Sequence, residues 1–92
     1  MIGLEARPRH REGLLAQRAG ETRVLLDPDD GQYYALDEVG GRIWDLCDGT
    51  RSVAAVVEEI CREYDAPAEE VVPDVLDFLK EMADGHLLLL ES

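Results

Sequence analysis

Long apolar runs, basic side chains and aromatic rings are all scarce in this sequence of 92 residues. No apolar run approaches the roughly 18 residues that a membrane-spanning helix needs. None follows the N-terminus as a secretory signal peptide would require, so we expect a cytoplasmic protein that does not enter a membrane. The length suits one domain over residues 1–92, whose residues 1–11 we expect to be mobile or loosely ordered.

Basic residues number 9 against 21 acidic ones, which gives a formal net charge of −12. A field of this sign repels phosphate backbones and anionic lipid headgroups. Partners are therefore expected to be neutral, basic or apolar.

Cysteine and histidine are also rare, with two of each. Cys47 and Cys61 form no CxxC pair and fall on the apolar faces of predicted helices, so we interpret them as buried structural thiols rather than a disulfide or metal site. Glycine-rich phosphate loops, HExxH and GxSxG are missing as well. The sequence therefore predicts neither an enzyme nor a cofactor site.

The first half of the sequence reads as strands. Residues 14–18 and 22–26 are joined by a short connection containing Gly20, which is typical of a hairpin. Pro28 and Gly31 then suit a turn that leads into a third strand at 32–36. Three strands in this order predict an antiparallel meander.

The second half reads as three helices. Asp37 can cap a helix from 38 to about 47, and Ser52 can cap a second one with apolar residues at helical spacing up to Tyr64. A third starts near Pro67 and ends at about 84 before Gly85; Pro73 should kink it or split off its first turn. Residues 86–90 either add a short strand or simply pack.

A meander followed by three helices predicts an α+β fold resembling a winged helix-turn-helix, an architecture that often binds DNA. The third helix would have to face the phosphates. Its exposed positions are expected to be six acids and one base: Glu69, Glu70, Asp74, Asp77, Lys80, Glu81 and Asp84. The charge has the wrong sign for nucleic acid, so we expect none to bind.

The third strand is the most informative stretch for function. Residues 32–36 contain no charge and no proline, the usual devices that block a sheet edge. If Tyr34 and Leu36 face inward, Tyr33 and Ala35 point the other way. Such an edge could accept a strand from a partner, or the two tyrosines could simply cover the hairpin. It could equally pair with a second copy to form a homodimer.

Residues 12–90 carry a resemblance to the PqqD-like family of leader-peptide recognition elements. Its marks are ALDEVGGRIWDL after the second hairpin, DGTRSV before the second helix, and DVLDFLKEM before a glycine and a run of leucines. Stand-alone relatives serve radical S-adenosylmethionine enzymes, and others serve the leader peptidase of lasso peptide synthesis. The sequence does not choose between these pathways.

The resemblance implies that the leader of a ribosomally synthesised precursor peptide adds as an antiparallel strand to the third strand, against the third helix, and reaches a modifying enzyme. It assigns backbone pairing to Gln32, Tyr33, Tyr34 and Ala35, and an apolar groove to Val71, Val75, Phe78 and Leu79. The alternative is a non-catalytic scaffold or regulatory domain that docks a protein through the acidic third-helix surface.

Overall fold

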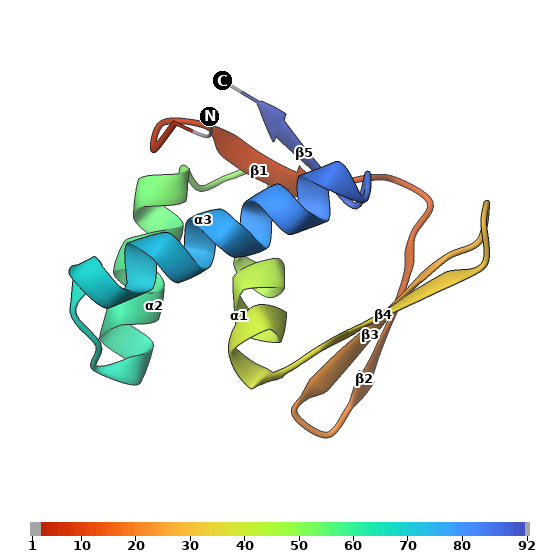
Figure 1. The fold of residues 1–92 in the computed structure, drawn as a ribbon, viewed down its shortest axis with the longest axis horizontal. Coiled ribbons are helices and arrows are strands. Elements are labelled where there is room, and N and C mark those ends of the chain that lie inside the picture. Colours follow the sequence, from red (N-terminus) through yellow and green to blue (C-terminus); the bar gives the residue numbers. More distant parts are fainter. Residues whose placement is uncertain (1–2, 92) are drawn as a thin grey trace.

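The computed structural model describes residues 3–91, which form two antiparallel sheets and three helices (Figure 1). Met1, Ile2 and Ser92, which the expected domain includes, lie outside the described residues. The elements follow in the order β1 (Arg7–His10), β2 (Leu15–Ala19), β3 (Thr22–Asp27), β4 (Gln32–Leu36), α1 (Glu38–Leu46), α2 (Val53–Tyr64), α3 (Ala68–Asp84) and β5 (Leu88–Glu91). The predicted α+β class, a three-stranded meander before three helices, is confirmed.

The meander has the strand order β2-β3-β4, so β3 is central and β4 is an edge. The strand predicted at 14–18 lies one residue further on, at 15–19, whereas the strand predicted at 32–36 is found at those residues. The amide of Gly31 donates to the carbonyl of Asp27 over 2.8 Å and closes the turn before β4. Gly31 has a φ of 72°, which explains the glycine there.

α1 and α2 begin at the predicted caps. The carboxylate of Asp37 accepts from the Gly40 amide over 2.7 Å, and the hydroxyl of Ser52 accepts from the Ala55 amide over 3.2 Å. Pro73 lies in the second turn of α3, and the helix continues through it to Asp84. The proline therefore does not separate the first turn from the rest, which was one of its two expected effects.

A second sheet joins the two ends of the described chain, because β1 pairs with β5 (Figure 1). Residues 1–11 were expected to be mobile or loosely ordered, yet residues 7–10 form this strand. Its four residues show no apolar alternation, and its partner lies at the far end of the chain, so local pattern gives no signal for it. Of the two alternatives for the tail, the strand is confirmed.

The core lies where α3 crosses the other two helices and meets the inner face of the meander (Figure 1). Leu25 and Leu36 contribute from the sheet, while Trp44 contributes from α1. The ring of His10 stacks on Trp44 with centroids 3.9 Å apart, and its Nε2 lies 2.6 Å from the Trp44 carbonyl oxygen. No helix within residues 3–91 is long and apolar enough to cross a membrane.

Candidate functional site

The outer edge of β4 is open. β4 pairs with β3 on one side, and no strand among residues 3–91 pairs with it on the other. In an antiparallel sheet, every second residue of an edge strand points its N–H and C=O groups away from its neighbour. The uncharged run Gln32–Leu36 therefore presents unpaired backbone donors and acceptors to a partner.

The two tyrosines of β4 face opposite ways, as the alternation predicted. Tyr33 is 71% exposed, whereas Tyr34 is half-buried against the core and Leu36 is buried. The Tyr34 hydroxyl lies 3.6 Å from the place a Cβ on Gly85 would occupy, at the end of α3. Tyr34 thus holds the sheet to α3, and Tyr33 stands free beside the open edge.

A hollow of about 190 Å³ lies where the end of β4 meets α1 and α3. We call it the β4 groove. Its lining comes from the end of β4 and the start of α1, and from the second half of α3: Ala35, Leu36, Asp37, Gly40, Phe78, Glu81 and Met82. An open strand edge and a partly apolar hollow therefore stand side by side.

The predicted site residues divide into two groups in the structure. Gln32, Tyr33 and Ala35 are exposed, and Phe78 is half-buried in the β4 groove. Val75 and Leu79 are 0% exposed and Val71 is 5% exposed, so these three side chains belong to the core. The lining of the β4 groove thus differs from the predicted one, because the α3 stripe that looks apolar in sequence mostly faces α1 and α2.

Five lining residues were not among the predicted ones: Leu36, Asp37, Gly40, Glu81 and Met82. Met82 lies one turn beyond Phe78 on α3, and Glu81 and Gly40 border the same hollow. The spacing from Phe78 to Met82 was readable as a helical face. The contribution of α1 was not, since it depends on how closely α1 and α3 approach.

Gly40 sets that approach. A Cβ at this position would lie 3.3 Å from Cε1 of Phe78 and 3.1 Å from Oδ1 of Asp37. The glycine therefore lets the Phe78 ring lie against the first turn of α1. The paired glycines were expected to let α1 approach a neighbouring backbone closely, whereas the neighbour at Gly40 is the side chain of Phe78.

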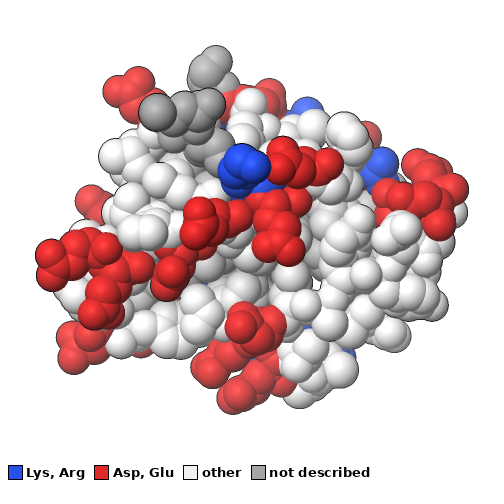
Figure 2. Space-filling model, viewed as in Figure 1, with Lys and Arg blue, Asp and Glu red and all other residues white. Residues whose placement is uncertain are grey.

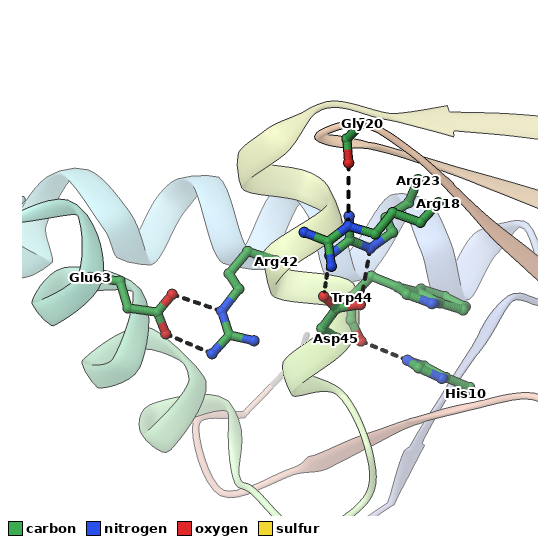
Figure 3. A network of polar contacts seen from close by, with 8 residues as sticks. All are labelled: His10, Arg18, Gly20, Arg23, Arg42, Trp44, Asp45 and Glu63. Atoms are coloured by element: carbon green, nitrogen blue, oxygen red, sulfur yellow. Dashed lines mark hydrogen bonds and ion pairs between the residues drawn. The ribbon is translucent and has the colours of Figure 1, made fainter.

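Arginine pairs fasten α1 to the elements around it (Figure 3). Arg23 of β3 donates to Asp45 through Nη2 over 2.6 Å and through Nε over 3.4 Å. Arg42 donates to Glu63 of α2 over 2.7 and 2.8 Å. These bonds raise the pKa of both arginines, and the Arg42 bond lowers the pKa of Glu63. α1, and with it one wall of the β4 groove, is thereby fixed to β3 and α2.

The exposed side of α3 is acidic. The seven residues predicted to be exposed on this helix are all exposed, six of them acids. Figure 2 shows acidic groups spread over the face that α3 crosses, with few basic ones among them. A partner on this face meets mostly negative charge, which repels phosphate groups.

The cysteines are free thiols, Cys47 buried and Cys61 half-buried. Burial raises the pKa of Cys47 to about 12. Within residues 3–91 no cluster of His, Cys, Asp and Glu side chains could hold a metal ion. The interpretation of Cys47 as a buried structural thiol is confirmed, and Cys61 is partly accessible.

Comparison with known families gives one match over most of the chain. Residues 22–88 match the model described as coenzyme PQQ synthesis protein D (PqqD). A PqqA binding protein of Rhodopseudomonas palustris (strain BisB5) is 37% identical over 86 residues, which cover 90% of this chain and 78% of the relative. A PqqA binding protein of Xanthomonas axonopodis pv. citri (strain 306) is 33% identical and covers 97% of both chains.

Solved structures resemble this one closely. TbiB1 in complex with the TbiA(beta) leader peptide has a TM-score of 0.80 and 32% identity, covering 87% of this chain and 93% of that one. The PqqD truncation of Methylobacterium extorquens PqqCD, described as a stand-alone recognition element for ribosomally synthesised and modified peptides, has a TM-score of 0.79 at 23% identity, covering 97% and 95%. At that identity the second likeness concerns the fold alone.

Proposed function

This chain belongs to the PqqD family, and from that premise we propose that it binds the leader of a ribosomally synthesised precursor peptide and delivers it to a modifying enzyme. The leader adds to the open edge of β4 as an antiparallel strand, beside α3. Gln32, Tyr33, Tyr34 and Ala35 supply the strand, and Phe78 supplies an apolar contact. Family membership also agrees with the expectation of a non-catalytic protein, because the curated relatives are named as binding proteins.

The observation that carries this proposal is the position of the β4 groove beside the uncharged edge. A strand added to β4 points alternate side chains toward the groove and away from it. The groove side meets Phe78 and, at the floor of the groove, the buried Met82, while the other side passes the exposed ring of Tyr33. Val71, Val75 and Leu79 do not line this groove and pack beneath α3.

Backbone pairing alone is too weak for this function. Each net hydrogen bond contributes roughly 0.5 to 1.5 kcal/mol, and a micromolar Kd requires about 8 kcal/mol. Apolar side chains of the leader must add the rest by burial in the groove and against Tyr33. The sequence of the leader therefore matters, although the strand itself is tolerant of sequence.

The proposal is tested by amide-shift titration of the labelled protein with leader peptides encoded beside its gene. We expect shifts at Gln32–Leu36 and at Phe78 and Met82, with little change at β2. A scrambled leader is the control, and equal affinity for it would contradict the proposal. Pairing of β4 with a second copy would show as shifts that depend on protein concentration without peptide.

Delivery to an enzyme is a second step, with a radical S-adenosylmethionine enzyme and a leader peptidase as the two candidates. Both require that enzyme and peptide bind together, which raises the local concentration of the precursor. A pull-down of each purified enzyme by the labelled protein, with and without leader, distinguishes them. Retention of neither enzyme would limit the function to peptide binding.

A second candidate function is that of a scaffold or regulatory domain docking a basic protein through α3. The exposed acids of α3 favour it. Binding of this kind falls steeply with salt and does not depend on Tyr33. The affinity for the basic partner is measured at several salt concentrations for the wild type and for Tyr33→Asp. A steep fall with salt that is equal in both proteins indicates docking on α3 and not strand addition.

A further inference from the structure

A second hollow lies between the three helices, apart from the open edge of β4. We call it the three-helix pocket; its volume is about 160 Å³. Its floor is apolar, because Ile43, Ile60 and Val75 are each at most 3% exposed, and Val39 stands at its mouth with 39% exposure. A cavity of about 150 Å³ lined by apolar side chains accepts a benzene ring. The pocket therefore has room for one phenyl or branched aliphatic side chain.

The charge at this pocket is of one sign. Glu70 and Asp74 line it from α3, one turn apart, and both are exposed. Within residues 3–91 neither carboxylate forms an ion pair, and no Lys or Arg lines the pocket. When an apolar side chain of a partner fills the pocket, Glu70 and Asp74 lie next to the backbone of that partner or next to its adjacent side chain. A cation there is favoured, while an anion is repelled.

The pocket adjoins the β4 groove. Val39 and Asp74 line the pocket, whereas the next residue of α1, Gly40, and the residue one turn on in α3, Phe78, line the groove. The contact of the Phe78 ring with Gly40 separates the two hollows. A peptide that leaves the β4 edge along α3 therefore reaches the three-helix pocket after passing this contact.

From these observations we infer that the three-helix pocket binds an apolar side chain of the leader that has a Lys or Arg next to it. This inference rests on the proposed function and names the class of leader: one with an apolar and basic pair outside its strand-forming segment. Glu70 and Asp74 select the cation, and the apolar floor selects its neighbour. A leader with an acidic residue at that place is rejected.

A charge exchange with a matched control tests the inference. A random-peptide display library is selected on the wild type, on Glu70→Lys/Asp74→Lys and on Glu69→Lys/Asp77→Lys. The control pair lies on the same helix, is exposed, makes the same change of charge and does not line the pocket. Dispersion of the amide spectrum checks that each variant is folded.

We expect the wild type and the control to enrich a large apolar residue beside Lys or Arg, and the pocket variant to enrich the same residue beside Asp or Glu. A peptide selected on the wild type should bind the pocket variant roughly tenfold or more weakly and the control at most about threefold more weakly. Identical enrichment on all three proteins would overturn the inference.

Amide shifts of a selected peptide separate this inference from the proposed function. Shifts at Gln32–Leu36 without any at Val39, Ala66 and Val71 would refute the pocket and leave strand addition standing. Shifts at the pocket alone would support the pocket and remove the strand from the mechanism. Shifts at both sites support the full inference.

Discussion

The aliphatic stem of Arg23 crosses α1 directly over Gly41, where a Cβ would lie only 2.7 Å from Cγ of that arginine. The absence of a side chain lets Arg23 reach from β3 to Asp45, which lies one turn further along the same face of α1. Gly41 thus permits an ion pair that helps to fasten the meander to α1.

Gly41→Ala should therefore destabilise the protein although alanine is the better helix former. We expect a loss of about 1 to 2 kcal/mol from the forced displacement of Arg23, measured by urea unfolding. In an Arg23→Ala background the obstacle is gone, and the same change should stabilise by about 0.5 to 1 kcal/mol. A loss of equal size in both backgrounds would show that the Arg23 stem is not the cause.

Asp27 makes stability depend on pH. Burial raises its pKa, but the hydrogen bonds from Arg11 and from the Asp29 amide lower it more, so the pKa lies below its usual value. The unfolded chain then binds the proton more readily than the folded one. The stabilisation is complete above the usual Asp pKa of about 4 and is lost as pH falls through the lower folded value.

Asp27→Asn should accordingly lower the Tm by several degrees at neutral pH and have a much smaller effect near pH 2. Thermal unfolding at a series of pH values measures this difference. Asp29→Asn is the control, because the Asp29 side chain is 83% exposed and its Oδ2 lies 3.8 Å from Nη1 of Arg11, which makes a weaker ion pair. A difference between wild type and Asp27→Asn that does not change with pH would contradict the ion pair.

Cys47 should resist alkylation in the folded protein. With a pKa of about 12, only about one thiol in ten thousand is ionised at pH 8, and the side chain is 0% exposed. Cys61 is half-buried and should react first. Mass spectrometry of iodoacetamide-treated Cys61→Ser, native and in urea, measures the rate at Cys47. Rapid labelling of the native variant would mean that the core opens readily.

Much of this fold could be predicted because its signals are local. The caps at Asp37 and Ser52 and the turn at Gly31 each depend on a few neighbouring residues, and β4 was located to the residue. The β1–β5 pair could not be predicted, since it joins the ends of the chain through backbone bonds and its register leaves no mark in a short sequence. The open edge could be predicted from one strand alone, because residues 32–36 contain no charged side chain.

The site residues on α3 were harder to predict than the strand edge. The apolar stripe of α3 is wide enough to serve both the core and a groove, and periodicity alone does not say which residues do which. Packing against α1 and α2 buries Val75 and Leu79 and leaves Phe78 half-exposed. The three-helix pocket is likewise invisible in sequence, because it depends on a space left between three separate helices.

Tyr33 provides the sharpest single test of strand addition. It is 71% exposed on the outward face of β4, and in the sheet register it aligns through Leu26 with Leu15, which is 58% exposed on β2. The two side chains thus share one face at opposite edges of the sheet. Tyr33→Asp should cost little stability, since an exposed ring loses few contacts, and should weaken leader binding roughly tenfold.

Leu15→Asp is the matched control for Tyr33→Asp, as it places the same charge on the same face but away from the β4 edge. Calorimetric titration with the leader should give a Kd close to that of the wild type for this variant. If both variants weaken binding equally, the leader lies across the face of the sheet and not along its edge. If neither does, the tyrosine only covers the hairpin, and the affinity must come from the β4 groove and the backbone of β4.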